Sequence, residues 1–469
     1  MRRQKSSHIV RLSLAVLMTL MLSIASAAST QGSIRHATSA NATGISGDGS
    51  IWYLAEGSTA WGFICMIAIE NPNPDDVTLR ITFMTDSGPI TWGDIVLPGE
   101  SQGILDPESD LGEIDFSTKV ECLEGKRIAV DRTMLWIGDE TTGAVEGHSS
   151  IGVTSPDTTW FLPEGSSAWG FECWLLIQNP NSTEATCTVT YMIEGLGLIV
   201  KSKTVPANSR RTFNMADDIG AKDASIKVES NIPVIPERAM YRNNSREGHD
   251  SIGTTKSAKD YYLAEGTTGW GFNTYVLVQN PNPVPANVII VYMTPDGPVS
   301  APVFQMPANS RKTIRVTDFL PDTDFSTRVH SDVPIIAERA MYWDNGTGEA
   351  CHDSIGMDSP HTDFYLPAGA TGGDEQFETW TLVQNPNSTS VTIQVSYLPN
   401  TADGGSKIVF MDTLPPNSRK TYNMADKIPD GEAAIMVTSV TTEKKIMVER
   451  SMYWYGKEGG TDTIGGFSD

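Results

Sequence analysis

The sequence predicts an all-β protein built from four tandem immunoglobulin-like antiparallel β-sandwich domains in an extended array. Three observations lead to this fold class: a set of motifs occurs four times, apolar and polar residues alternate with a period of two, and no stretch shows a helix pattern. The Asn-Pro-Asn motif marks the repeats most plainly, at residues 71–73, 179–181, 280–282 and 385–387. A repeat of about a hundred residues with about seven short strands has the size of an immunoglobulin-like sandwich.

The chain begins with the pattern of a secretory signal peptide over residues 1–27. A basic head precedes the apolar stretch Leu12–Ile24, and a run of small residues ends at Ala27 as a cleavage site. Residues 28–50 are rich in Ser, Ala, Thr and Gly, a composition typical of a flexible leader. We therefore expect a secreted protein, extracellular or at the cell surface, with no membrane span after signal cleavage.

Four repeats follow, separated by only a few residues. Their predicted bounds are 51–153, 158–253, 260–356 and 362–469, and the last repeat is atypical and terminal. Linkers this short restrict the relative motion of neighbouring domains, so the prediction is a semi-rigid rod. The Tyr-Leu-Ala-Glu-Gly segment near the start of each repeat either opens that repeat or, alternatively, completes the one before it.

Within a repeat, the strand signal is the alternation of side chains. In the first repeat the residues at 77, 79, 81 and 83 are apolar, and those at 78, 80 and 82 are polar. This pattern indicates an antiparallel strand with one face buried and the other in solvent. The Asn-Pro-Asn motif just before it interrupts the preceding strand, because Pro has no amide hydrogen and Asn tolerates turn geometry.

The combination of motifs resembles a known group of repeats. Tyr-Leu-Ala-Glu-Gly, Gly-Phe, Asn-Pro-Asn, Pro-Ala-Asn-Ser-Arg and Glu-Arg-x-Met-Tyr, in this order, are similar to tandem repeats of uncharacterised secreted bacterial surface proteins. The resemblance covers residues 51–465. It implies an extracellular β-sandwich array and carries no mechanism with it.

The composition and motifs argue against several functions. The formal net charge of −23 argues against nucleic acid as a partner, since phosphates are neutralised by Lys and Arg. His-Asp-Ser occurs at 249–251 and 352–354, but adjacent residues on one strand do not converge on a single reacting atom. The sequence has no phosphate-binding loop, zinc spacing or complete calcium loop. We therefore predict no enzyme, no catalytic residue, no cofactor and no metal.

The fourth repeat lacks three features that the other repeats share. Ala368 replaces a glutamate, an acidic loop at 374–376 replaces a tryptophan, and Thr461 replaces a histidine. The shared residues are Glu56, Glu164 and Glu265; Trp61, Trp169 and Trp270; and His148, His249 and His352. Since the three disappear together although they are far apart in sequence, we expect them to touch in the fold.

Two interpretations of these nine residues remain open. They form the joint with the next repeat, which a terminal repeat does not need, or they form ligand-binding subsites with Trp as a stacking platform for a sugar. The joint is the favoured interpretation, and an exposed row of Trp would reverse it. The corresponding functions are a secreted, non-enzymatic surface or matrix protein acting as a structural or adhesive rod, and alternatively a carbohydrate-binding repeat array using the Trp-Gly-Phe loops. The partner would be a protein or glycan of the cell envelope or the extracellular space.

The cysteines and the Glu-Arg pairs give two further expectations. Export favours disulfides, and we predict the pairs Cys65–Cys122 and Cys173–Cys187, with Cys351 free. A Glu-Arg or Asp-Arg pair occurs in every repeat, and its members point to opposite faces of a strand. Arg450 persists where Ala368 replaces the upstream glutamate, so such an arginine has another partner.

Overall fold

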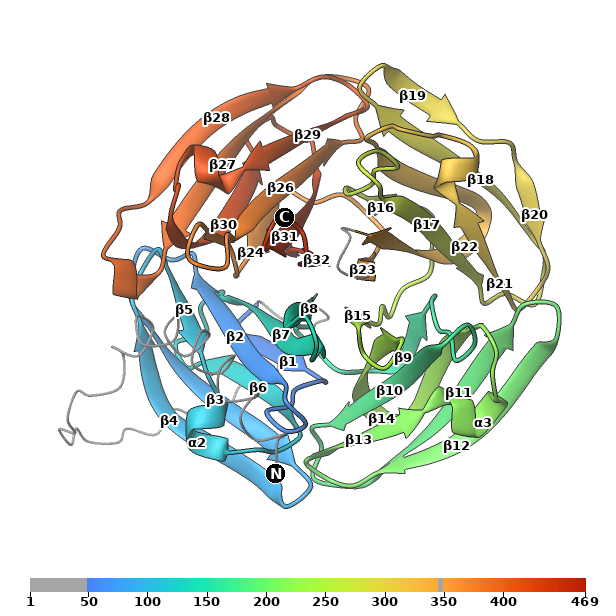
Figure 1. Cartoon of the computed structure of the whole chain (residues 1–469), viewed down its shortest axis with the longest axis horizontal. Helices are drawn as coiled ribbons and strands as arrows, with labels where there is room; N and C mark the ends of the chain where they lie inside the picture. The colour runs from blue at the N-terminus through green and yellow to red at the C-terminus, as the bar shows by residue number, and fades with distance from the viewer. Residues whose placement is uncertain (1–48, 345–348) are drawn as a thin grey trace.

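The computed structural model describes residues 49–344 and 349–469 and shows a nearly all-β molecule, as predicted. The predicted signal peptide, 1–27, and all but the last two residues of the predicted leader, 28–50, lie outside the described residues. Among those described, no helix is long and apolar enough to cross a membrane. Figure 1 shows four groups of strands arranged around a central axis, one group for each sequence repeat.

The first two repeats contain fifteen strands and two short helices. The first repeat has β1 (Ile51–Leu54), β2 (Ile64–Asn71), β3 (Val77–Thr85), β4 (Gly88–Leu97), β5 (Ser101–Leu105), α2 (Glu108–Leu111), β6 (Phe116–Cys122), β7 (Ala129–Asp139) and β8 (Ala144–Ile151). The second has β9 (Asp157–Leu162), β10 (Phe171–Asn179), β11 (Ala185–Ile193), β12 (Gly197–Val205), β13 (Ser209–Asn214), α3 (Met215–Ile219), β14 (Ala224–Arg242) and β15 (Glu247–Ile252).

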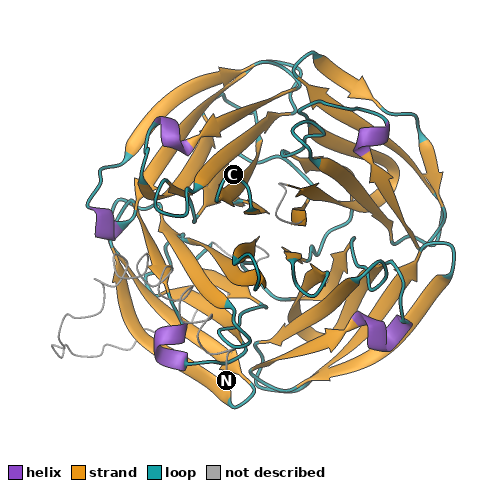
Figure 2. Cartoon of the chain, in the orientation of Figure 1, coloured by secondary structure: helices purple, strands orange, loops and turns teal. Residues whose placement is uncertain are grey.

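The last two repeats follow the same order with small differences. The third has β16 (Ala258–Leu263), β17 (Asn273–Asn280), β18 (Ala286–Thr294), β19 (Gly297–Ser300), β20 (Phe304–Met306), β21 (Ser310–Arg315), η1 (Val316–Asp318), β22 (Ser326–Asp344) and β23 (Glu349–Ile355). The fourth has β24 (Asp363–Leu366), β25 (Ala370–Thr371), β26 (Glu378–Asn385), β27 (Val391–Pro399), η2 (Thr401–Asp403), β28 (Ile408–Leu414), β29 (Ser418–Asn423), η3 (Met424–Asp426), β30 (Gly431–Ser439), β31 (Met447–Trp454), β32 (Gly459–Ile464) and β33 (Gly466–Ser468). The helical turns sit on the connections between strands (Figure 2).

Each repeat has two faces of antiparallel strands. In the first repeat the rim sheet has the order β1-β6-β3-β4 and the axial sheet the order β5-β2-β7-β8. In the second and third repeats, one strand of 19 residues (β14 or β22) takes part in both faces and joins them into one sheet. The strand β1 pairs with β6 of its own repeat, so the Tyr-Leu-Ala-Glu-Gly segment opens its repeat rather than completing the one before.

The predicted alternation places the core between the two faces. Along β3, Val77, Leu79, Ile81 and Phe83 are buried, whereas Arg80 between them is exposed. Removing these apolar side chains from water is the main stabilising contribution to such a sandwich.

The Asn-Pro-Asn motif moves the chain from one face to the other. The side-chain Nδ2 of Asn71 donates to the carbonyl oxygens of Asp75, Leu97 and Pro98 at 3.0, 3.2 and 2.8 Å, and its Oδ1 accepts from the backbone N–H of Asn73 at 3.1 Å. These bonds satisfy backbone groups that a strand-to-strand ladder would otherwise use. The turn therefore ends β2 in the axial sheet and begins β3 in the rim sheet.

The predicted extended array is wrong, because the four repeats close into a ring. The first and fourth repeats touch directly: Trp454 Nε1 donates to Val145 O at 2.7 Å, and Arg450 Nη1 lies 3.1 Å from Asp131 Oδ2. The linkers between the repeats are short. They did not specify the angle between neighbours, and that angle brings the ends of the array together (Figure 1).

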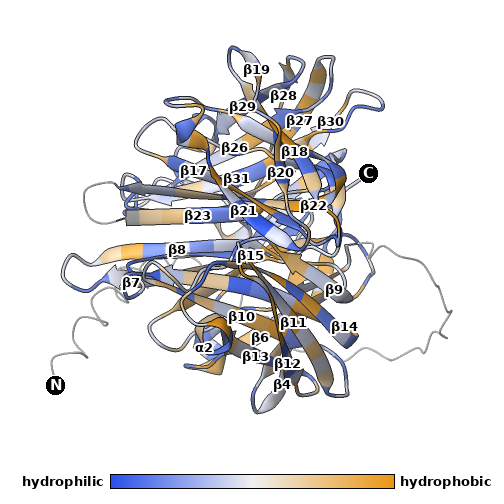
Figure 3. Cartoon of the chain, turned by 90° about the vertical axis from the view of Figure 1, so that its right-hand side faces the viewer, coloured by the Kyte–Doolittle hydropathy of each residue, from blue (hydrophilic) through white to orange (hydrophobic). Residues whose placement is uncertain are grey.

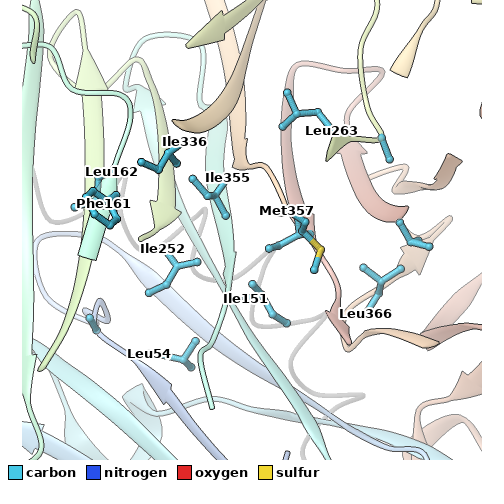
Figure 4. Close-up of a cluster of buried hydrophobic side chains, with 14 of the residues drawn as sticks. Leu54, Ile151, Phe161, Leu162, Ile252, Leu263, Ile336, Ile355, Met357 and Leu366 are labelled. Atoms are coloured by element: carbon cyan, nitrogen blue, oxygen red, sulfur yellow. The ribbon is translucent and has the colours of Figure 1, made fainter. Parts of the chain in front are cut away.

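Four strands, one from each repeat, run side by side along the axis of the ring. They are β8, β15, β23 and β32, and each contacts the next, with β32 returning to β8. The side view shows β8, β15 and β23 crossing the middle of the molecule together (Figure 3). Apolar side chains from all four repeats meet near the axis, among them Ile151, Ile252 and Ile355 (Figure 4). The axial cavity measures only about 10 Å³, so the centre of the ring is packed.

The predicted disulfides are also wrong, since all five cysteines are free and buried. The prediction for Cys173 and Cys187 assumed a hairpin at Pro180. The Asn-Pro-Asn turn instead sends β10 and β11 to different faces, and the two strands do not pair. Burial raises the pKa of the Cys65 and Cys173 thiols to about 12, which keeps them in the unreactive thiol form.

Candidate functional site

A buried cluster of charged side chains joins the second repeat to the third. Arg238 on β14 lies at its centre, with Nη1 at 3.1 Å from Glu338 Oε1 of the third repeat and 3.6 Å from Glu164 Oε2 of its own repeat. Asp353 on β23 accepts a further bond from Arg238 Nη2. All four side chains are almost fully buried. The arginine thus neutralises carboxylates from both sides of the boundary.

The same cluster occurs at the two neighbouring boundaries. At the first–second boundary, Arg132 contacts Glu56, Glu237 and Asp250 at 2.9, 2.9 and 2.7 Å. At the third–fourth boundary, Arg339 contacts Glu449 and Asp462 at 3.2 and 2.6 Å. There Glu265 pairs instead with Arg419, at 3.1 Å. We call these three sets the interface clusters.

The predicted proximity of glutamate and histidine is confirmed at two boundaries. His148 Nε2 lies 3.8 Å from Glu56 Oε2, and His249 Nδ1 lies 3.9 Å from Glu164 Oε2. Each of the three histidines also bonds to a tyrosine of the next repeat. These pairs are His148 with Tyr241 at 3.1 Å, His249 with Tyr342 at 3.0 Å, and His352 with Tyr453 at 3.0 Å. The glutamates and histidines therefore belong to the joints between repeats.

Burial shifts the pKa values of the acids in these clusters. It raises the pKa of Glu338 to about 8, and the neighbouring Asp353 and Glu164 add to the shift against the opposing effect of Arg238. Burial likewise lifts the pKa of Asp250 and of Glu449 well above the usual range. Several carboxylates around one guanidinium leave an excess of negative charge in a water-poor site, and bound protons neutralise it.

The histidines respond to their local charges in opposite ways. Burial lowers the pKa of His148 and His352 well below the usual range, and Arg132 and Arg339 repel a proton on them further. Burial acts in the same direction on His249, but Asp353 and Glu164 outweigh it and raise its pKa. His249 is accordingly the histidine best placed to carry a proton inside a cluster.

Two of the clusters have the residue types of a metal site. The groups Glu56, His148 and Asp250, and Glu164, His249 and Asp353, each have ligand atoms within 4.8 Å of one another. The guanidinium of an arginine already lies between the carboxylates: Arg132 Nη2 contacts Glu56 and Asp250. Since an arginine does not lose its charge in proteins, a metal cation in the same place would be repelled. The donor set does not fit a metal, and the arginine is the cation of each cluster.

The fourth boundary, which closes the ring, has a different chemistry on both of its sides. We call it the seam. Among the described residues, Arg450 Nη1 bonds to Asp131 Oδ2 at 3.1 Å and to the carbonyl oxygen of Ala368 at 2.8 Å. Gln102 Nε2 donates to Pro367 O at 2.7 Å, where other boundaries have an arginine.

Six positions change together at the seam. In the fourth repeat, a glutamate is replaced by Ala368 and a histidine by Thr461. In the first repeat, a glutamate is replaced by Asp131, a tyrosine by Leu135, an aspartate by Ser149 and an arginine by Gln102. The residue replacements that the sequence shows in the fourth repeat are thus matched by replacements in the first repeat. The two faces of the seam lack the histidine of the other boundaries and two of their carboxylates, and they contain the buried carboxylates Asp131 and Glu70. Comparing both ends of each repeat would have revealed the tyrosines and aspartates that sequence reasoning missed.

The three tryptophans do not join these clusters. Trp61, Trp169 and Trp270 are 83%, 80% and 82% exposed, so the expectation that Glu, Trp and His all touch is wrong for Trp. Each tryptophan is the first central residue of a tight four-residue turn. The backbone N–H of the Phe that ends the turn donates to the carbonyl oxygen of the residue that begins it, as Phe171 N does to Ala168 O at 2.9 Å. Such a turn leaves the Trp side chain pointing away from the core.

The backbone of each Trp turn is left-handed. Trp61, Trp169 and Trp270 have φ values of 62°, 59° and 58°, and the glycine after each also has a positive φ. These are the angles of a type I′ turn, whose first central position normally holds Asn, Asp or Gly. A bulky residue there costs about 1–2 kcal/mol. The structure thus places three large aromatic side chains at an unfavourable conformation and in solvent, where they gain little from burial.

Neighbouring carboxylates orient two of the indole rings. Trp169 Nε1 donates to Asp223 Oδ2 at 3.1 Å, and Trp61 Nε1 lies 3.5 Å from Asp115 Oδ2. Beside Trp169 the second and third repeats enclose a cleft of about 570 Å³. Its walls include Phe171, Tyr275 and Arg311.

No protein-family model matches the chain, and no curated protein matches it. Among solved structures, Thermotoga maritima 1070 is 14% identical over 22% of this chain and 97% of its own, with a TM-score of 0.21. The Anabaena sensory rhodopsin transducer is 26% identical over 18% of this chain and 96% of its own, with a TM-score of 0.17. A tetra-tandem repeat from the extending region of a large adhesion protein is 11% identical over 85% of this chain and 93% of its own, with a TM-score of 0.10. TM-scores this low carry no argument about function.

Proposed function

We propose that this chain is an exported, non-enzymatic carbohydrate-binding protein in which a ring of four immunoglobulin-like sandwiches presents three tryptophan turns to sugars. The observation that carries the proposal is the conformation of Trp61, Trp169 and Trp270. Each is strained, each is exposed, and the same arrangement occurs three times. Strain that brings no burial is typical of a residue kept for what it contacts.

Tryptophan suits a sugar better than other exposed groups do. Its flat apolar face packs against the C–H face of a pyranose ring, and its N–H keeps a polar partner. In Trp169 that partner is Asp223, so the ring orientation is set before a ligand arrives. A pre-oriented platform loses less side-chain freedom on binding, which improves affinity.

Three turns on one closed body also favour binding to a surface that carries many glycans. A single stacking contact is weak, but linked sites on a rigid body raise the overall affinity of the molecule when their spacing matches the glycans. A role as an adhesive protein at the cell surface agrees with this mode of binding. A rod-shaped spacer does not, because the repeats close on themselves.

Replacing all three tryptophans with glycine is expected to abolish binding without destabilising the ring. Glycine adopts the left-handed conformation freely, so each substitution should leave the free energy of unfolding unchanged or raise it by about 1 kcal/mol. A glycan array with the secreted chain identifies the ligands, and isothermal titration compares the variant with the unmodified protein. Denaturant unfolding measures stability.

The control is Leu196→Ala, which removes another exposed apolar side chain from a turn flanked by glycines. It should retain binding. Undiminished binding by the triple Trp→Gly variant would refute the proposed function. A loss of more than about 1 kcal/mol in that variant would show that the tryptophans serve stability instead.

A further inference from the structure

We propose that the cleft between the second and third repeats is specific for an acidic sugar, whose carboxylate pairs with Arg311. This inference rests on the proposed function and assigns the ligand class of one of its sites. The arginines that correspond to Arg311 at two other boundaries make bonds that Arg311 does not make.

The counterparts of Arg311 reach across their boundaries. Arg210 Nη1 donates to Gly57 O at 3.2 Å, and Arg419 Nη1 pairs with Glu265 at 3.1 Å and donates to Gly266 O at 3.2 Å. Each thus bonds to the repeat before its own. These contacts neutralise the positive charge of the guanidinium or satisfy its hydrogen-bond donors.

Arg311 instead turns back along its own strand. Its Nη2 donates to Thr313 Oγ1 at 2.7 Å, its Nε is buried without a partner, and the residue is only 5% exposed. No carboxylate of the described residues lies within ion-pair distance of it. A buried guanidinium without a counter-charge is costly, and an anionic ligand would remove that cost.

A second difference between this boundary and the others lies in the wall of the cleft. At the other three boundaries a tryptophan crosses to the next repeat: Trp136 Nε1 donates to Ser245 O, Trp343 Nε1 to Lys457 O, and Trp454 Nε1 to Val145 O, at 2.7, 2.8 and 2.7 Å. At the second–third boundary the residue is Arg242. It pairs with Glu247, and its guanidinium lies over the rings of Phe171 and Tyr342 at 5.0 and 5.5 Å. Arg242, which stands in place of the tryptophan, is one of the residues that line the cleft.

The remaining polar groups of the cleft define the class of ligand. Four carboxylates also line it, those of Glu164, Glu194, Asp223 and Asp344, and carboxylates accept hydrogen bonds from sugar hydroxyls. They repel a ligand with several negative charges, while Arg311 offers a two-pronged partner for one carboxylate. Trp169 at the same cleft supplies the stacking surface. One carboxylate, several hydroxyls and an apolar ring face together describe a uronic acid.

The test is the affinity for a galacturonic acid trisaccharide against the neutral galactose trisaccharide, at equal ionic strength. We expect the acidic trisaccharide to bind at least tenfold more tightly. Arg311→Gln should remove this preference, so that the acidic and the neutral trisaccharide bind the variant with similar affinity. Arg315→Gln is the matched control, since it removes the same charge from the same strand outside the cleft, and it should keep the preference.

Other results of this experiment would contradict either this inference or the proposed function. Equal affinity for the two trisaccharides, or a preference that survives in Arg311→Gln, overturns this inference and leaves the proposed function standing. Inorganic phosphate or sulfate that competes as well as the trisaccharide would show an unselective anion site, which also overturns it. Failure of every glycan on the array to bind the unmodified protein refutes the proposed function itself. Thermal unfolding of Arg311→Gln confirms that the variant is folded.

Discussion

Replacing Arg238 with methionine is expected to lower the free energy of unfolding by about 3–5 kcal/mol. The guanidinium is fully buried and faces Glu338, Asp353 and Glu164. Methionine fills much of the same volume but leaves these carboxylates without their cation. Some of them will take up protons, which limits the loss but does not cancel it. Denaturant unfolding monitored by tryptophan fluorescence measures the change.

Two further variants test the reason for that loss. Arg211→Met removes an arginine that is 41% exposed and pairs with Asp86 at the surface, so it should cost less than about 1 kcal/mol. Combining Arg238→Met with Glu338→Gln and Asp353→Asn should restore part of the stability, because the unpaired charges disappear with their cation. If Arg238→Met unfolds at the same denaturant concentration as the unmodified protein, the interface clusters do not hold the repeats together.

The second large effect is a dependence of stability on pH that runs opposite to simple acid denaturation. The pKa of Glu338 is about 8 in the folded ring against its usual 4.5. Between these values the folded protein holds a proton that the unfolded chain has released. The free energy of unfolding therefore falls as pH rises through this window, by up to about 1.4 kcal/mol per pH unit for each such proton. Burial shifts the pKa of Asp250 and of Glu449 in the same direction.

Histidines set the lower limit of this trend. Burial lowers the pKa of His148 and His352, so below pH 6.5 the unfolded chain takes up protons that the folded ring refuses. Stability should therefore rise as the pH drops from 8 to about 6.5 and should level off or fall below that. Unfolding curves across this range measure the slope, and Glu338→Gln, which mimics the protonated acid, should flatten it. A free energy of unfolding that rises between pH 6.5 and 8 would contradict the claim that buried acids of the interface clusters hold protons in the folded ring.

The local structure was predictable because it depends on neighbouring residues. Alternation at 77–83 identified a strand with one buried face, and the Asn-Pro-Asn motif marked a turn. The direction in which that turn sends the chain depends on bonds from Asn71 to residues 26 and 27 positions later. Sequence spacing alone made Cys173 and Cys187 look like partners across a hairpin, although the two strands lie in different faces.

The closed ring depends on contacts that no local pattern contains. Short joints fit a rod and a ring equally well, because they do not state the angle between repeats. The replacements at Ala368 and Thr461 did indicate ring closure. The residues that face them across the seam are replaced as well, in the first repeat, at Ser149 and Leu135. The sequence named Trp169 as a ligand-binding candidate. Its exposure and its left-handed backbone, which favour binding over packing, are properties of the folded turn.

Ring closure is tested most directly by cross-linking the first repeat to the fourth. Lys407 Nζ lies 2.8 Å from Glu100 Oε1 across the seam, and both side chains are partly exposed. The double variant Glu100→Cys and Lys407→Cys places two accessible thiols there, whereas the five native cysteines are buried. A short bifunctional thiol reagent should link the two repeats within one monomer at low protein concentration, and mass spectrometry of the digested product should recover the joined peptides. Absence of that link, or its appearance only between different chains, would contradict the closed ring.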